Sequence, residues 1–289
     1  MSYNRYFIYR MLFIASIFCL MFTAAVFGET PEEKGRQIME KIDSRPILEK
    51  SMSRSTLIIY DAQGKVLFTK KSRTAGYVQD FRDKNKKLGR SITNFFSPAD
   101  DKGNGALMME VADDDDNQWL YLKGLRKPKR VVGSDKSSSF MGSDFSNGDL
   151  GARDIDDSVY TWLGREKVKY KKKKYTAEKI QNVFKDQQQQ KDYGYSKTIV
   201  WMHVKTGLPL KMEYHDMNGQ LIKKGRLLDF KVKKNRDRKK VFMPSSLEMK
   251  NVLRGTRTVM KMKDIKTGSK AKKVRPGIFK VDYLTRKWW

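Results

Sequence analysis

The chain has 289 residues, a formal net charge of +28 at pH 7 and 39% hydrophobic residues including five tryptophans, a composition that excludes a disordered chain. Its single cysteine excludes a disulfide framework and a cysteine-based metal site. In a cytosolic protein this surplus of Lys and Arg would predict nucleic-acid binding, because cationic side chains neutralise phosphates.

Residues 1–28 have the pattern of an export signal. Arg5 and Arg10 give it a positive start, and residues 11–25 form an apolar run without charges. The end of the segment places small residues at the positions that a signal peptidase reads. The alternative is an uncleaved membrane anchor, since the apolar run can be extended to Phe27, which is just long enough to span a bilayer.

Export changes what the positive charge predicts. Cleavage leaves residues 29–289, which we expect to form a single domain in the periplasm with a net charge of +26, that is 28 minus two arginines. Cys19 leaves with the signal, so no thiol chemistry is predicted. Because lipid is the abundant anion there, an anionic membrane surface replaces nucleic acid as the expected partner. The alternative is that the charge serves solubility.

A helix is predicted over residues 30–42. Thr30 can cap its start, Pro31 suits the first helical position, and Glu33 completes a capping box. The residues that then share an apolar face are Ile38, Met39 and Ile42.

From residue 56 onward the pattern is that of β-strands. Two hairpins are predicted, one around Asp61–Gly64 and one around Asp216–Gly219, where Asn218 and Gly219 favour a type I′ turn. Their strands are residues 56–60 with 65–68 and 211–214 with 220–222, and further strands are predicted at 89–96, 106–111, 118–122, 129–132, 198–204, 225–231, 241–250 and 256–263. This spacing is typical of an antiparallel sandwich or barrel.

Residues 169–190 interrupt the strands. Thr176 can cap a helix whose face carries Ile180, Val183 and Phe184. The segment predicts a short surface helix, placed where a half-barrel could carry a lid.

The usual motifs of catalysis, metal binding and cofactor binding fail. His203 and His215 each lie in a predicted strand, so they do not form a zinc site. The acidic run at residues 113–116 lacks the Gly and Glu positions of a calcium loop, and Ser143 lacks the second Gly of a nucleophile elbow. A hydrolase would need two facing carboxylates. The candidates are Asp135, Asp144, Asp149, Asp154, Asp156 and Asp157. We predict no enzyme activity, no metal and no cofactor.

One stretch, within residues 118–145, is similar to a known protein family. The order of Gln118–Leu122, Arg130, Ser134–Lys136 and Phe140–Phe145 resembles the signature of the periplasmic outer-membrane lipoprotein-sorting family, the LolA/LolB-like carriers. Residues 206–209, Thr-Gly-Leu-Pro, extend the similarity more loosely.

The resemblance implies a mainly β fold with few helices: a curved antiparallel sheet that forms an open half-barrel around an apolar cavity, with an N-terminal helix and a helical lid. It implies a carrier that binds lipid or lipoprotein acyl chains and moves them toward the outer membrane, and a link to an inner-membrane exporter of the resistance-nodulation type. The cavity candidates are Trp119, Tyr121, Phe140, Met141, Phe145 and Trp201. The candidates for an anionic headgroup or membrane surface are Arg126, Arg130, Lys171, Lys172, Lys173 and Lys174.

Two alternatives stay open. Strand aromatics are often ordinary core, and the two phenylalanines that flank the Gly-Ser-Asp turn could tie the sheet together. The protein could then be a non-catalytic envelope adaptor that binds an export pump or an anionic polymer through its basic surface. The weaker alternative is a hydrolase that uses the aspartates.

Overall fold

The computed structural model describes residues 28–81, 86–111, 117–151 and 154–289. The predicted export signal and the acidic run at residues 113–116 lie outside the described residues. Pro31–Trp289 form one compact unit. In the described part of the chain, no helix is both long enough and apolar enough to cross a membrane.

Within the described residues, thirteen strands form one antiparallel sheet in the order β6-β5-β4-β3-β2-β1-β13-β12-β11-β10-β9-β8-β7. The strands are β1 Lys50–Tyr60, β2 Val66–Phe81, β3 Lys86–Ser97, β4 Gly105–Met109, β5 Asn117–Tyr121, β6 Pro128–Arg130, β7 Ser158–Tyr170, β8 Lys173–Phe184, β9 Lys197–His203, β10 Pro209–His215, β11 Leu221–Lys234, β12 Lys240–Asn251 and β13 Arg257–Thr267. The α-helices are α2 Pro31–Asp43, α3 Asn147–Leu150 and α4 Gln187–Tyr193. The mainly β, antiparallel fold is therefore confirmed. The segments expected as strands from residue 56 onward are strands, except that 220–222 and 225–231 belong to one continuous strand, β11.

The N-terminal helix α2 begins at Pro31, as predicted, and its apolar face packs on the sheet. Ile38, Met39 and Ile42 contact a cluster built from β7, β8 and β9 residues. Contact is closest at Gly35, which is buried: a Cβ there would lie 2.3 Å from the carbonyl oxygen of Tyr160. Glycine is required at this position because α2 lies directly against the backbone of the edge strand β7.

Replacing Gly35 with alanine is therefore expected to lower the free energy of unfolding by about 1–3 kcal/mol, the usual cost of forcing extra atoms into a packed contact. Urea denaturation measures it. The matched control is Gly124→Ala, where an added Cβ meets nothing within 4 Å, so its effect should stay within about 0.5 kcal/mol. Equal effects of the two substitutions would contradict the close packing of α2 on β7.

The two predicted hairpins are confirmed, but the type I′ turn is wrong. Asp61 and Asp216 each use Oδ1 to accept N–H groups two and four residues ahead, at 2.8–3.1 Å. Gly64 and Gly219 have positive φ, of 83° and 79°, whereas Asn218 does not. The aspartate side chain organises a four-residue turn in both hairpins, and only the glycine position needs a left-handed conformation.

The predicted helical lid over residues 169–190 is also wrong. Most of that segment is strand β8, which pairs with β7 through a turn at Lys171, and only α4 is helical. Cross-strand contacts explain the difference: Lys179 Nζ lies 2.8 Å from Glu166 Oε1, and Trp162 Nε1 donates to Glu178 Oε2 at 2.8 Å. Such pairs stabilise a sheet.

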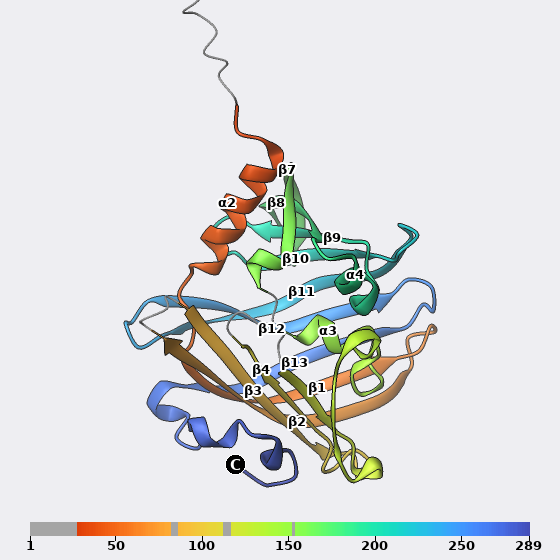
Figure 1. The fold of residues 1–289 in the computed structure, drawn as a ribbon, viewed down its shortest axis with the longest axis vertical. Coiled ribbons are helices and arrows are strands. Elements are labelled where there is room, and N and C mark those ends of the chain that lie inside the picture. Colours follow the sequence, from red (N-terminus) through yellow and green to blue (C-terminus); the bar gives the residue numbers. More distant parts are fainter. Residues whose placement is uncertain (1–27, 82–85, 112–116, 152–153) are drawn as a thin grey trace, which may run out of the picture. The chain divides into compact units, whose positions relative to one another are not determined.

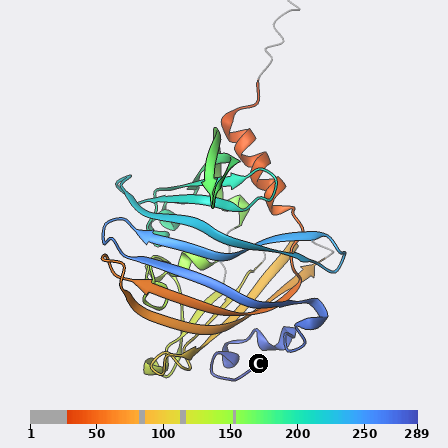
Figure 2. The same cartoon turned by 180° about the vertical axis from the view of Figure 1, so that it is seen from behind.

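The sheet is curved, and Figures 1 and 2 show it bent around the residues that connect β6 to β7. We call residues 131–151 of this connection the crossing segment. Because β6 and β7 are the two edges of the sheet, the connection must pass from one edge to the other. The crossing segment lies on the concave side.

The C-terminal residues 268–289 cover part of the other, convex face. Their buried side chains pack against Ala75, Ile92 and Leu107 of β2, β3 and β4. Asn94 fixes this cover, since its Nδ2 donates to Leu284 O at 2.9 Å and its Oδ1 accepts from Trp288 Nε1 at 2.5 Å. The buried residues of the cover are Ala271, Val274, Ile278, Phe279, Leu284 and Trp288.

Candidate functional site

The crossing segment fills the concave side of the sheet with apolar side chains. Phe140 and Met141 pack against Leu57, Phe95 and Ala106, which belong to β1, β3 and β4. Phe145 packs in a second cluster with Tyr195, Tyr214 and Met249, toward the other half of the sheet. One short segment therefore contacts both halves of the sheet and holds its curvature.

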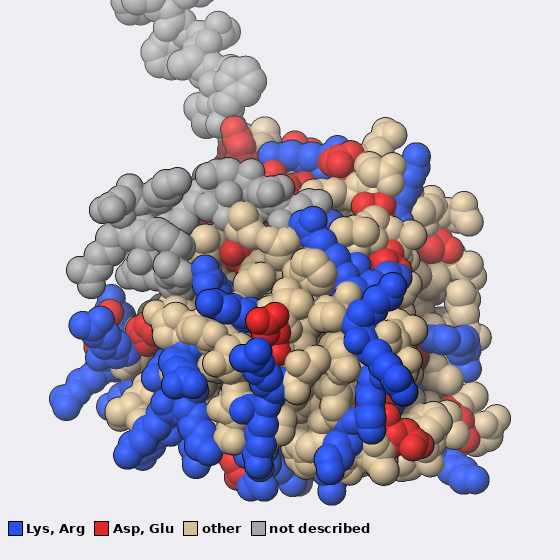
Figure 3. Space-filling view, turned by 60° about the horizontal axis from the view of Figure 1, so that its bottom comes forward, with Lys and Arg blue, Asp and Glu red and all other residues tan. Residues whose placement is uncertain are grey.

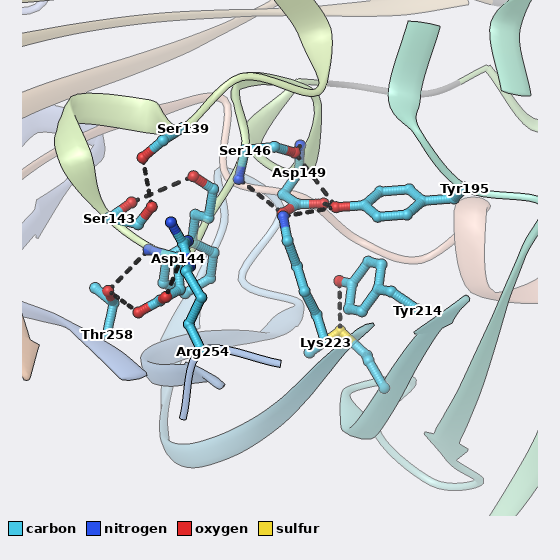
Figure 4. A network of polar contacts seen from close by, with 12 residues as sticks. Ser139, Ser143, Asp144, Ser146, Asp149, Tyr195, Tyr214, Lys223, Arg254 and Thr258 are labelled. Carbon is cyan, nitrogen blue, oxygen red and sulfur yellow. Dashed lines mark hydrogen bonds and ion pairs between the residues drawn. The ribbon is translucent and has the colours of Figure 1, made fainter. Parts of the chain in front are cut away.

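A first polar anchor joins the crossing segment to β13. The carboxylate of Asp144, which is 4% exposed, accepts hydrogen bonds from Thr256 Oγ1 at 2.6 Å and from Thr258 Oγ1 at 2.8 Å. The backbone N–H of Asp144 donates to Thr258 Oγ1 at 2.9 Å, and Arg254 Nη2 lies 3.6 Å from Oδ1. In Figure 4, Thr258 and Arg254 lie beside the Asp144 carboxylate. The acid that follows Gly142-Ser143 is thus a structural anchor.

A second anchor joins the segment to β11 and to the start of β9. Asp149 Oδ1 accepts from the hydroxyl of Tyr195 at 2.9 Å, and its Oδ2 lies 3.3 Å from Lys223 Nζ. Lys223 Nζ also donates to the hydroxyl of Tyr195 at 2.9 Å. Ser146 and Asp149 form a capping box at the start of α3. The side chains of Asp149 and Lys223 are 1% and 12% exposed, so this is a buried ion pair (Figure 4).

Burial raises the pKa of Tyr195 well above its ordinary value, and the negative charge of Asp149 acts in the same direction. The folded protein therefore holds the phenol proton more tightly than the unfolded chain does. That contribution to stability is complete below about pH 10, the pKa of an unfolded tyrosine, and is lost as the pH rises above it.

We expect Tyr195→Phe to reduce the loss of stability between pH 8 and pH 11, at a cost near pH 7 of about 1 kcal/mol for the lost hydrogen bonds. Urea midpoints across this pH range test it. Some alkaline loss should remain in the variant, because burial also raises the pKa of Tyr170. Identical pH profiles for the two proteins would contradict the buried phenol.

The six cavity candidates do not line one shared space. Phe140, Met141 and Phe145 lie on the concave side, as described above. Trp119 and Tyr121 pack against the convex face cluster that includes the C-terminal cover. Trp201 is 3% exposed in a third cluster, where its Nε1 donates to Glu166 Oε2 at 2.6 Å. Trp119 and Tyr121 are two residues apart in β5 and so share the face opposite to Leu120 and Leu122, which pack with the crossing segment.

The basic candidates also fall in two places. Arg126 and Arg130 are exposed at the β5–β6 end of the sheet, whereas Lys171 to Lys174 are exposed at the turn between β7 and β8, near the opposite edge. Lys171 has a positive φ of 54°, and its Nζ lies 2.8 Å from Asp229 Oδ1.

The C-terminal cover carries a basic surface that the sequence-based candidates did not include. Its exposed cations form no ion pair with any carboxylate of the described residues. They are Lys270, Lys272, Lys273, Arg275, Lys280, Arg286 and Lys287. Figure 3 views the underside of the molecule, where Lys and Arg side chains outnumber Asp and Glu.

The aspartates suggested for a hydrolase have structural partners. Besides Asp144 and Asp149, Asp135 pairs with Lys129 at 2.8 Å, Asp154 accepts from the N–H of Asp156, and Asp156 pairs with Arg36 at 2.5 Å. Among the described residues, no group of three His, Cys, Asp or Glu side chains could hold a metal ion.

Comparisons with known proteins agree with this architecture. A family model described as "Uncharacterized protein" matches residues 87–286. A comparison with curated proteins found no match. A crystal structure of a candidate outer membrane lipoprotein-sorting protein domain from Vibrio parahaemolyticus is 25% identical, with a TM-score of 0.75 over 88% of this chain and 100% of that one.

Two further solved structures share the fold. A DUF1329 family protein from Desulfovibrio piger is 24% identical, with a TM-score of 0.74 over 88% of this chain and 99% of its own. A LolA superfamily protein from Nitrosomonas europaea is 18% identical, with a TM-score of 0.62 over 86% and 98%. The resemblance of residues 118–145 predicted a LolA-like fold, and these structures confirm that fold.

Proposed function

We propose that this chain is a periplasmic carrier of lipid or lipoprotein acyl chains. The chain belongs to the family of uncharacterized proteins whose model matches residues 87–286, and it has the LolA-like fold. The direction we propose is toward the outer membrane. An exporter of the resistance-nodulation type in the inner membrane is the partner we propose for loading.

The observation that supports a carrier is the way the concave face is covered. Its apolar side chains are hidden by the crossing segment, which is not a strand of the sheet and is held there by the Asp144 and Asp149 anchors. Displacement of this segment would expose apolar surface on both halves of the sheet. An acyl chain can then bind without specific polar contacts, because each buried methylene contributes about 0.8 kcal/mol.

The test is to purify the exported protein and to identify bound lipid by mass spectrometry after organic extraction. We expect phospholipid or acylated peptide in the extract, and displacement of a bound fluorescent fatty acid by unlabelled lipid. Repeated absence of lipid, together with no binding of the fluorescent fatty acid, would refute the carrier.

A second function is favoured by a different observation. The concave side is occupied by the chain itself, while the C-terminal cover presents cations that form no ion pair with the carboxylates of the described residues. An adaptor would use that cover to bind an anionic envelope polymer. Lipid-free protein that binds lipopolysaccharide, and loses the binding when Lys272, Lys273 and Arg275 are replaced with glutamine, would support the adaptor. Loss of lipopolysaccharide binding should leave any acyl-chain affinity unchanged.

A further inference from the structure

A pocket of about 320 Å³ lies apart from the crossing segment and its two anchors. The linker that follows α2, the turn between β9 and β10 and the first residues of β12 line it, and it opens to the surface. Its volume is at the lower end of the roughly 300–1,000 Å³ found for ligand sites, which suits a slender ligand. The apolar side chains that line it are Ile42, Pro46, Ile47, Leu48, Val241, Phe242 and Met243.

A single cation lies among these apolar groups. Arg45 donates from Nη2 to Val204 O at 3.2 Å and from Nη1 to Lys205 O at 3.4 Å. No carboxylate of the described residues forms an ion pair with it, and burial lowers its pKa. Arg45 is half-buried, and the hydrogen bonds of its guanidinium go to backbone carbonyls, which carry no negative charge. A ligand with an anionic group would supply the missing partner through charge-assisted hydrogen bonds.

The turn that supports Arg45 is built for this arrangement. Gly207 has a φ of 65°, and a Cβ on it would lie 2.4 Å from Arg45 Nη1, so any other residue would push the guanidinium away. Thr206 lines the pocket, and its hydroxyl lies 2.7 Å from His203 Nδ1. Thr206 and Gly207, the first two residues of the Thr-Gly-Leu-Pro run, thus form part of the pocket wall, while Leu208 is buried in a core cluster.

We propose that this pocket binds one acyl chain that ends in an anionic group, with the chain against Leu48, Phe242 and Met243 and the anion on Arg45. This inference adds a second site, separate from the concave face, and rests on the proposed carrier function for the class of ligand. A free fatty acid and a lysophospholipid share the required chemistry, an acyl chain with a negative end.

The test uses two substitutions and a fluorescent fatty acid as probe. Met243→Trp should fill the pocket and Arg45→Gln should remove the anion partner, and each is expected to weaken binding about ten- to a hundredfold. Arg45→Lys should recover part of the affinity. The matched control is Leu253→Trp, since Leu253 is 60% exposed on the β12–β13 turn and should leave affinity unchanged. Thermal unfolding of each variant checks that it is folded.

Competition distinguishes the ligand sources. Displacement by palmitate supports a carboxylate ligand, and displacement by lysophosphatidylglycerol alone supports a phospholipid-derived one. A long-chain alcohol has no anionic end, so it should displace the probe equally well from wild type and from Arg45→Gln. If Met243→Trp and Arg45→Gln both keep wild-type affinity, the pocket is not the site, while lipid found in the extract would leave the carrier function standing. Wild-type protein that neither contains lipid nor binds the probe would overturn both.

Discussion

Replacing Asp149 with alanine is expected to lower the free energy of unfolding by about 3–5 kcal/mol, because it leaves the charge of Lys223 buried without a partner. The substitution also removes the acceptor of the Tyr195 hydroxyl and the carboxylate that accepts from the Ser146 N–H in the capping box of α3. Since Asp149 is one of two polar anchors of the crossing segment, the concave face should become accessible as well. Urea denaturation measures the first effect, and increased binding of an apolar fluorescent dye measures the second.

The matched control is Asp156→Ala. Asp156 also pairs with a basic residue, Arg36, but its side chain is 72% exposed, and such surface pairs contribute at most about 1 kcal/mol. A loss below about 1 kcal/mol for Asp149→Ala, similar to that of the control, would contradict a buried anchor. A large loss of stability without greater dye binding would mean that the segment stays in place and that the anchor serves stability alone.

Most of the strands, though not β7 and β8, could be predicted because their signals are local. Asp61 and Asp216 each precede a glycine by three residues, and the runs on both sides are rich in β-formers, so the hairpins follow from neighbouring residues. In β13, basic residues alternate with Thr258, Met260 and Met262, a pattern typical of a strand with one buried face. Thr258 is indeed fully buried.

Strand β8 was missed because its local pattern is ambiguous. Ile180, Val183 and Phe184 have helical spacing, yet Ile180 and Phe184 are also an even number of residues apart, and both are buried in the strand. The decision comes from cross-strand partners such as Glu166 and Trp162, which lie 13 and 16 residues away from the residues they contact. No window within the segment itself contains that information.

The candidate site, too, could be predicted only in part from the sequence. The Gly-Ser-Asp turn with its two phenylalanines was identified from neighbouring residues, but its anchors were not. Asp144 meets Thr258 across 114 residues and Asp149 meets Lys223 across 74. The pocket beside Arg45 likewise joins residues about 160 positions apart. Such contacts follow only from the closure of the sheet, so single-sequence patterns cannot give them.

Replacing Lys172, Lys173 and Lys174 with glutamine is expected to weaken binding to phosphatidylglycerol vesicles about a hundredfold. All three side chains are exposed around the β7–β8 turn, and a cation close to an anionic membrane contributes about 1 kcal/mol, so three contribute about 3 kcal/mol. Lys171 is kept because it pairs with Asp229. Vesicle co-sedimentation measures the change, and affinity for acyl chains should stay the same.

Salt and a second triple variant provide the controls. Attraction of this kind is screened over about 8 Å at physiological ionic strength, so wild-type binding should fall steeply between low and moderate salt. Replacement of Lys272, Lys273 and Arg275 with glutamine removes the same charge from the C-terminal cover. This second variant should weaken vesicle binding less than the variant at the β7–β8 turn. Equal losses in the two variants would mean that total charge matters and not the β7–β8 turn. Binding to neutral vesicles as strong as to anionic ones would show that the lysines serve solubility, because no electrostatic attraction to the membrane would then be involved.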